Sequence, residues 1–87
     1  MNAFRLQVYS QEKKAYDGQV TSMIAPGADG FFGVQAHHAA LVALLGRGKL
    51  WLRREDGQEE TFMLEGGFLE VARNVATLLA DRIDSAA

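Results

Sequence analysis

Apolar and polar residues alternate with a period of two along most of the chain, as expected for strands that bury one face. Near the N-terminus Phe4, Leu6 and Val8 are each separated by one residue that is more polar. The same alternation predicts further strands over 15–24, 49–54, 59–64, 68–71 and 75–80. No segment shows the 3.6-residue period of an amphipathic helix convincingly. The pattern therefore predicts an all-β chain.

Turn signals separate these predicted strands. Asp56-Gly57 lies between two alternating runs and supplies the positive-φ residues that a type I′ hairpin turn requires. Gly66-Gly67 and Arg73-Asn74 predict further turns, and Asp17-Gly18 predicts a β-bulge inside the second strand. Short strands joined by turns, with no linker or repeat, predict one antiparallel sandwich or barrel over residues 1–87.

Residues 25–34 depart from the alternation. Three glycines stand three residues apart, the first of them preceded by Pro26. Glycine admits positive φ and proline removes a hydrogen-bond donor, so we expect consecutive tight turns here. The adjacent rings of Phe31 and Phe32 predict a loop that tucks one ring under the domain or offers one to a partner.

Residues 39–45 form the longest apolar run of the chain. Its composition suits a buried helix as well as a buried strand, and periodicity does not decide between them. The brevity of the run and the flanking Gly46-Arg47-Gly48 favour a buried strand. The run is also far shorter than the ~20 residues that span a bilayer.

Composition and charge narrow the function. The chain has 87 residues, a net charge of -2 and no cysteine, so packing without disulfides must hold one small domain together. The slight acidity argues against a general nucleic-acid binder, which would be markedly basic. The N-terminus enters the alternation directly, and we therefore expect no signal peptide. Any membrane association is expected to come through another protein.

The sequence offers no catalytic, metal or cofactor site. The neighbours His37 and His38 point to opposite sides in an extended chain and would not share a metal ion. The glycine spacing lacks the nearby Lys or Ser/Thr of a phosphate-binding loop. Glu59-Glu60 flanks an exposed turn, where a raised carboxyl pKa has no cause. We expect no catalytic residue, no metal and no cofactor.

Lys49, Trp51 and Arg53 lie on one face of a predicted strand. They would suit a platform for single-stranded nucleic acid. The opposing strand carries Glu59 and Thr61, so cross-strand pairing accounts for the same residues. The acidic balance of the chain favours pairing.

Several motifs along the chain resemble the N-terminal β-sandwich of the epsilon subunit of F-type ATP synthase (delta in mitochondrial naming). The resemblance covers almost the whole chain, in order and with little gapping. Its residues are Tyr16-Asp17-Gly18-Gln19-Val20, Ala25-Pro26-Gly27-Ala28-Asp29-Gly30, Phe32-Gly33-Val34, His38-Ala39, the Asp56-Gly57 hairpin with its Glu-rich continuation, Gly66-Gly67-Phe68-Leu69-Glu70-Val71 and Val75-Ala76-Thr77-Leu78-Leu79-Ala80-Asp81.

The resemblance implies a two-sheet antiparallel β-sandwich of about ten short strands. It implies a non-catalytic subunit at the foot of the central stalk that binds the gamma subunit, rests on the c-subunit rotor ring and couples proton flow to ATP synthesis. Such a subunit is peripheral, on the cytoplasmic face of the bacterial inner membrane. The alternative is a free-standing β-sandwich module for carbohydrate or another small ligand, with Phe31, Phe32 and Trp51 as stacking surfaces.

Two departures from the family pattern matter. Where the family has Leu-Pro-Gly-His-Ala-Pro, this chain has Gln35-Ala36-His37-His38-Ala39-Ala40, which keeps only the histidine and the alanine after it. Typical members also add a C-terminal helical hairpin that can inhibit rotation and, in some bacteria, binds ATP. We expect no such hairpin and no ATP binding here, in a chain that is either naturally short or truncated.

The resemblance also implies two sets of contacts. We expect Ala39–Leu45 to be partly interfacial, because interface cores are depleted in charge. The expected gamma contacts are Ala39, Leu41, Val42 and Leu44. The expected rotor-ring contacts are Asp29, Gly30, Phe31, Phe32 and His38.

Overall fold

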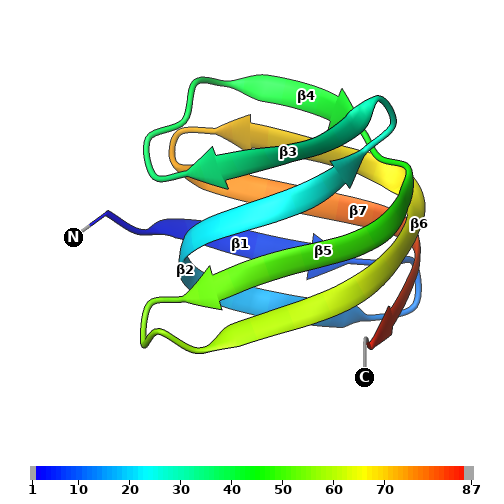
Figure 1. Ribbon diagram of the computed structural model, residues 1–87, viewed down its shortest axis with the longest axis horizontal. Helices are drawn as coiled ribbons and strands as arrows, with labels where there is room; N and C mark the ends of the chain where they lie inside the picture. The colour runs from blue at the N-terminus through cyan, green and yellow to red at the C-terminus, as the bar shows by residue number, and fades with distance from the viewer. Residues whose placement is uncertain (1, 86–87) are drawn as a thin grey trace.

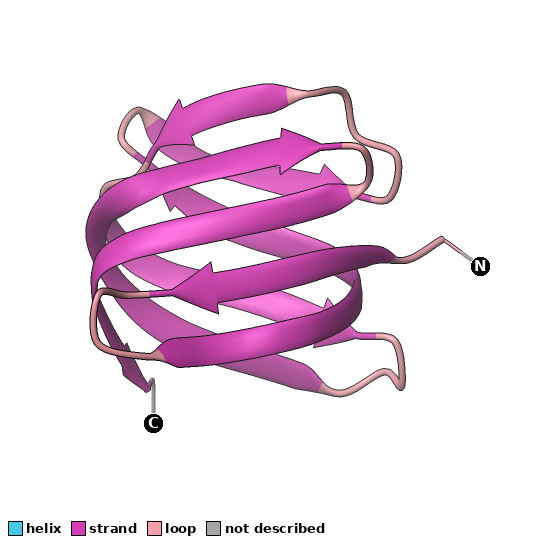
Figure 2. Ribbon diagram, turned by 180° about the vertical axis from the view of Figure 1, so that it is seen from behind, coloured by secondary structure: helices cyan, strands magenta, loops and turns pink. Residues whose placement is uncertain are grey.

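The computed structural model describes residues 2–85, which form seven strands and no helix. The strands are β1 (Phe4–Tyr9), β2 (Lys14–Gly27), β3 (Gly30–Gln35), β4 (Leu41–Leu44), β5 (Arg47–Arg54), β6 (Glu59–Ala72) and β7 (Val75–Ser85). Figure 1 shows them wrapped around one interior, and Figure 2 shows the same strands from behind. The predicted all-β class is confirmed.

The strands form one continuous sheet that closes on itself. Its order is β1-β7-β6-β5-β2-β3, and β1 also pairs with β2, so β1, β7, β6, β5 and β2 make a ring. The ring differs from the expected two-sheet sandwich of about ten short strands. β2 and β6 are each 14 residues long: β2 extends the strand predicted over 15–24 as far as Gly27, and β6 joins the two strands predicted over 59–64 and 68–71.

Two glycines mark the bend of β6, where a turn was expected. The strand runs through Gly66 (φ +67°) and Gly67 (φ +116°) without reversing direction. A Cβ on Gly67 would overlap the carbonyl oxygen of Leu79, so this approach of β6 to β7 requires glycine. The predicted turn at Gly66-Gly67 is therefore wrong. The glycines bend a continuous strand.

The Pro26 segment forms a hairpin and not the consecutive turns expected. β2 continues through Pro26 to Gly27 and pairs with β3, with Gly27 opposite Gly30. Proline is accommodated at position 26 because its pair with Phe31 exchanges no hydrogen bonds, so β3 does not need an N–H there. The Pro26 carbonyl accepts a hydrogen bond from the Gly46 N–H at 2.9 Å. A short turn at residues 28–29 joins β2 to β3.

Both predicted tight turns are present, and only the first differs from the type that was expected. The hairpin after β5 is present, with Arg53 opposite Glu59, but Gly57 alone has positive φ (+90°), and a type I′ turn requires two such residues. In the Arg73-Asn74 turn both central residues have positive φ, 52° for Arg73 and 62° for Asn74. Asn adopts this conformation more readily than most residues, and here the Asn74 side chain bonds to the backbone of His37 and Ala3.

The predicted bulge at Asp17-Gly18 is also wrong. Leu6 pairs with Gly18 in regular register, and the irregularity lies next to Tyr9. Gly18 has a different role: a Cβ there would lie 3.0 Å from the Tyr16 hydroxyl oxygen, so the ring of Tyr16 lies across the glycine.

The core fills the ring of strands with the inward side chains of every strand except β4. Its largest fully buried members are Phe4, Leu6, Val8, Val20, Met23, Val34, Leu50, Leu52, Leu64, Leu69 and Leu78. Phe4, Leu6 and Val8 confirm the phase predicted for the first strand. Within residues 2–84 no buried side-chain polar atom lacks a hydrogen-bond partner. Chemistry beyond packing must therefore lie on the surface.

Candidate interaction surface

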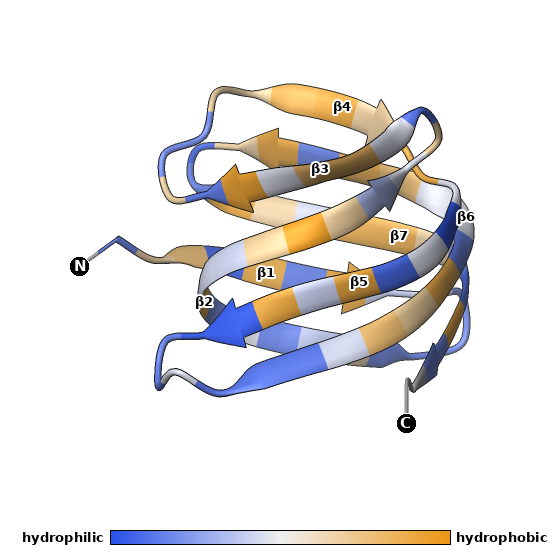
Figure 3. Cartoon of the chain, viewed as in Figure 1, coloured by the Kyte–Doolittle hydropathy of each residue, from blue (hydrophilic) through white to orange (hydrophobic). Residues whose placement is uncertain are grey.

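β4 exposes the apolar run that was expected to form a buried strand. Val42 and Leu44 are each 72% exposed, while Leu41 packs against the core. β4 pairs only with β6, so nothing among residues 2–85 covers its outer face. Figure 3 shows β4 as predominantly hydrophobic although it lies at the surface. The burial prediction is wrong: of residues 39–45 only Leu45 is buried, and Leu41 and Ala43 are half-buried.

The exposed side chains of β4 continue across two neighbouring strands. Leu44 pairs with Phe68 of β6, and Phe68 pairs with Leu79 of β7. Phe68 is 43% exposed and Leu79 is 40% exposed. We name Val42, Leu44, Phe68 and Leu79 the apolar row. A contiguous patch of this kind on a small domain marks an interaction site.

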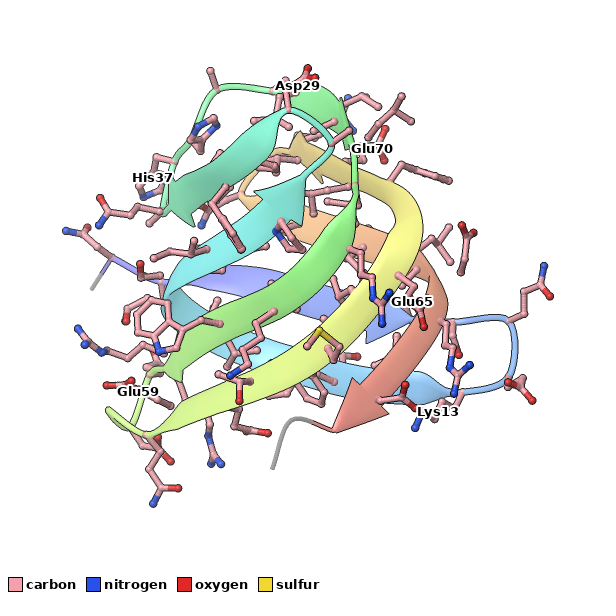
Figure 4. All side chains as sticks on the ribbon, turned by 45° about the vertical axis from the view of Figure 1, so that its right-hand side comes forward. Lys13, Asp29, His37, Glu59, Glu65 and Glu70 are labelled. Atoms are coloured by element: carbon pink, nitrogen blue, oxygen red, sulfur yellow. The ribbon has the colours of Figure 1, made fainter. Side chains whose placement is uncertain are left out.

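Sequence reasoning missed two members of this row. The alternation that buries Leu69 and Leu78 places Phe68 and Leu79 on the opposite, outward face. The sequence indicated which face of each strand points outward, but it did not indicate which strands pair. The pairing of β4, β6 and β7 brings Phe68 and Leu79 beside Leu44. Glu70, which pairs with Val42, lies next to the row, and Figure 4 shows its carboxylate beside β4.

The β2–β3 hairpin tip lies against the other side of β4. The Ala28 N–H donates to the Leu44 carbonyl at 2.9 Å, and Gly27 forms an isolated bridge with Leu45. One groove is lined by residues 27–32 of the hairpin and residues 42–44 of β4. The structure thus brings predicted ring contacts and predicted gamma contacts to opposite walls of one groove.

The two phenylalanines of the hairpin face different ways. Phe31 is 66% exposed, while Phe32 is half-buried and packs against the core. This follows from the period of two in a strand. Asp29 and Gly30 are exposed at the tip. The side chains of Phe31 and Asp29 are therefore exposed to solvent, whereas Phe32 anchors the hairpin to the core.

His38 lies away from that tip. It follows β3, in the loop that leads to β4, and Figure 4 shows Asp29 and His37 at opposite ends of β3. His38 Nδ1 is 2.7 Å from the carbonyl oxygen of Ala39. The five predicted contacts with the rotor ring thus lie in two places, four at the hairpin tip and one in the loop between β3 and β4.

Asn74 holds the loop that contains His37. Its Oδ1 accepts from the His37 N–H at 2.7 Å, and its Nδ2 donates to the Ala3 carbonyl at 2.8 Å. His37 has φ 62°, and it occupies the position of the glycine in the family motif. The sequence offered no signal for these contacts, because His37 and Ala3 lie 37 and 71 residues away from Asn74 in the chain.

Cross-strand pairing of Trp51 and Arg53 is confirmed. Trp51 Nε1 donates to a carboxylate oxygen of Glu59 at 2.7 Å, and Arg53 lies 3.4 Å from the other. Figure 4 shows Glu59 near the β5–β6 hairpin. The hydrogen bond from Trp51, and then that from Arg53, lowers the pKa of Glu59. These groups are engaged within the chain.

The three aromatic residues of the alternative hypothesis do not share the groove beside β4. Phe31 and Phe32 line the groove beside β4, but Trp51 is not among its lining residues. Among residues 2–85 no group of three or more His, Asp or Glu side chains could hold a metal ion. The part of the chain that the structure describes also contains no helix long and apolar enough to cross a membrane.

An all-β domain that exposes a contiguous row of large apolar side chains has the features of a protein-interaction domain. Residues 3–86 match the family of the ATP synthase delta/epsilon chain, β-sandwich domain. The chain belongs to this family.

Two curated relatives illustrate the range of lengths. The ATP synthase epsilon chain of Chlorobium limicola is 44% identical over 81 residues, which cover 93% of this chain and 92% of the relative. That of Protochlamydia amoebophila (strain UWE25) is 44% identical over 82 residues, which cover 94% of this chain but 56% of the relative. The chain therefore spans nearly all of some relatives and about half of others.

Solved structures share the fold. A chain in the cryo-EM structure of the Euglena gracilis mitochondrial ATP synthase, containing OSCP, F1 and c-ring, superposes with a TM-score of 0.89 at 22% identity. The match covers 95% of this chain and 53% of that one. A chain of the central stalk and c-ring of the Tetrahymena thermophila enzyme gives a TM-score of 0.77 at 17% identity.

Proposed function

We propose that this chain is a non-catalytic central-stalk subunit of a proton-translocating F-type ATP synthase. It links the gamma subunit to the c-subunit ring and so couples proton flow to ATP synthesis at the cytoplasmic face of a bacterial inner membrane. The observation that carries the proposal is the apolar row, exposed on a domain of the delta/epsilon family. The relatives named as ATP synthase epsilon chains support it.

The gamma subunit is the partner we assign to the apolar row. Burial of an exposed large apolar side chain contributes about 1.5–3 kcal/mol, so a few such residues can dominate an interface. Val42 and Leu44 keep the role expected of them, and Phe68 and Leu79 join them. Leu41 contributes mainly to the core, and Ala39 borders the contact from the exposed loop.

The rotor ring is the partner we assign to the hairpin tip. Asp29 offers a carboxylate to a basic side chain of the rotor ring, and the exposed phenyl group of Phe31 can stack on a guanidinium. Gly30 and Phe32 shape and anchor the tip. His38, at the other end of β3, is a second contact point. Asp29→Asn and Phe31→Ser, each measured for ring affinity in the assembled enzyme, separate these contributions.

Charge placed in the apolar row tests the gamma assignment. We expect Val42→Asp and Leu44→Asp each to weaken binding to gamma by about tenfold or more, since a buried carboxylate would be unpaired. Because both side chains are exposed in the free chain, its melting temperature should fall by only a few degrees. Titration calorimetry and thermal melts measure the two effects.

The matched control is Gln11→Asp, which adds the same charge in the exposed turn between β1 and β2. It should leave gamma binding unchanged. Normal gamma binding by both row variants would show that the row is not the contact. Failure of the wild-type chain to co-purify with gamma and the c-ring would overturn the proposed function itself.

A further inference from the structure

β3 ends the order of paired strands and leaves one edge open. Among residues 2–85 it pairs only with β2, and Phe31 lies opposite Pro26. Pro26 has no N–H, and its carbonyl accepts from Gly46, so this pair exchanges no hydrogen bonds. Hydrogen-bonded and non-hydrogen-bonded pairs alternate in an antiparallel ladder. Phe32 and Val34 therefore bond to β2, whereas Phe31 and Gly33 direct their N–H and C=O groups to the open edge.

The usual protections of an open edge are missing here. Natural edge strands carry lysine, proline or inward charges that prevent another strand from pairing. Residues 30–45, which include β3 and β4, contain no Asp, Glu, Lys or Arg. An unprotected edge of this kind is a template for an added strand.

The side chains of β3 leave its backbone accessible. The Phe31 ring lies over Gly48 of β5, where an added Cβ would be 3.3 Å from the ring. An added Cβ on Gly33 would find only the Met23 carbonyl oxygen within 4 Å, at 3.7 Å, so Gly33 is not needed for packing inside the domain. A strand glycine without such a reason indicates that another backbone approaches closely.

The neighbouring contact face indicates what lies along this edge. The groove beside β3 has Val42, Ala43 and Leu44 of β4 as its other wall. Val42 and Leu44 belong to the apolar row assigned to gamma. The Ala28–Leu44 hydrogen bond closes the groove at the hairpin tip. A segment that continued from the apolar row into the groove would lie along the open edge of β3.

We propose that an extended segment of the gamma subunit, without charged side chains where it faces Val42, Ala43 and Leu44, adds a strand to β3. It pairs with the N–H and C=O groups of Phe31 and Gly33. This inference rests on the proposed function, which names gamma as the partner, and it adds main-chain pairing as the mode of recognition. The specificity then comes from the apolar β4 wall of the groove, formed by Val42, Ala43 and Leu44, and the affinity comes from the paired backbone.

Gly33→Pro against Gly33→Ala tests the pairing. Proline removes the N–H of residue 33, which the fold does not use, and proline is tolerated on an edge whose N–H faces outward. Alanine keeps the N–H and finds open space. We expect both variants to fold, Gly33→Ala to bind the gamma-containing F1 complex within about threefold of wild type, and Gly33→Pro to bind about tenfold or more weakly.

Amide hydrogen exchange of the unmodified chain gives a second test that needs no variant. In the free chain the amides of Phe31 and Gly33 should exchange fast and those of Phe32 and Val34 slowly. In complex with gamma-containing F1, Phe31 and Gly33 should gain about tenfold or more protection. Equal binding of the two Gly33 variants, or no added protection in a complex that forms, would overturn the inference and leave the proposed function intact. Failure of the complex to form would overturn both.

Discussion

His37 adopts a positive φ of 62° at a position where the family motif has glycine. For an L-residue this conformation costs about 1–2 kcal/mol. The hydrogen bond from its N–H to Asn74 offsets part of that cost. The loop between β3 and β4 is thus held by a contact from the β6–β7 turn and not by the prolines of the family pattern.

His37→Gly should therefore stabilise the chain. Glycine removes the steric cost but loses more backbone entropy, so we expect a net gain of about 0.5 kcal/mol, or roughly 2–4 °C in melting temperature. His38→Gly is the matched control, because His38 has no positive φ and should lose stability. Differential scanning calorimetry measures both, and a lower melting temperature for His37→Gly would contradict the assigned strain.

Glu59 shows how one exposed carboxylate is held by two neighbours. Its pKa lies below the ordinary value, first because of the hydrogen bond from Trp51 and second because of Arg53. A carboxyl pKa that is lowered in the folded state stabilises the fold at pH values above the unfolded-state pKa of about 4.3. That contribution is lost as pH falls through the lower, folded-state pKa.

We expect Trp51→Phe to raise the pKa of Glu59 more than Arg53→Gln does, since the bond from Trp51 is the larger cause. Carbon-detected NMR titration of the Glu59 carboxyl measures both shifts. A larger upward shift in Arg53→Gln would show that the guanidinium, and not the indole N–H, holds the charge.

At the scale of the element, β6 shows how glycine lets one strand serve two faces. Its first part pairs with β5 and its last part with β4, while β7 follows it through the bend. At the bend Leu45 donates to the Gly67 carbonyl at 2.9 Å, and Gly66 donates to the Gly46 carbonyl at 3.1 Å. These bonds fix the point where the chain passes from β4 to β5.

Gly67→Ala should be among the most damaging single changes in the chain. The new Cβ would overlap the Leu79 carbonyl oxygen, and φ +116° strains any residue with a side chain. We expect a loss of about 3 kcal/mol or more, or no folding at all. Urea denaturation measures the loss, and Gly33→Ala, where space is open, should change stability by no more than about 0.5 kcal/mol. Equal stability of the two variants would contradict the role of the bend.

At the scale of the whole molecule, closure joins the two ends of the chain. β1 lies between β2, which follows it directly, and β7, with which it pairs in parallel, Leu6 opposite Ala76 and Val8 opposite Leu78. The ring of strands cannot close until the C-terminal strand has formed. Non-local pairing of this kind makes folding slow, because loop closure costs entropy before the contacts form.

Refolding should accordingly take milliseconds to seconds and not microseconds. Stopped-flow fluorescence of Trp51, with far-UV circular dichroism as the control signal, should give the same rate from both signals if closure is cooperative. Refolding within about 100 μs would show that the ring closes without waiting for β7.

Period-two alternation determined much of this fold from the sequence alone. It identified the strand class and the inward phase of residues such as Leu6 and Val8, because the order of residues itself shows which face of a strand is apolar. It also located the hairpin at Gly57. The family resemblance rested on motifs that are likewise local in the chain.

Only the tertiary structure decided which strands lie at an edge and which pairs of strands meet. Alternation does not reveal whether an outward face is covered, so the exposure of Val42 and Leu44 and their pairing with Phe68 and Leu79 required the register of β4, β6 and β7. Gly66-Gly67 permits a turn or a bend in sequence, and the close approach of β7 selects the bend. The Asn74–His37 bond and the open edge of β3 depend on the same long-range pairing, which no local pattern encodes.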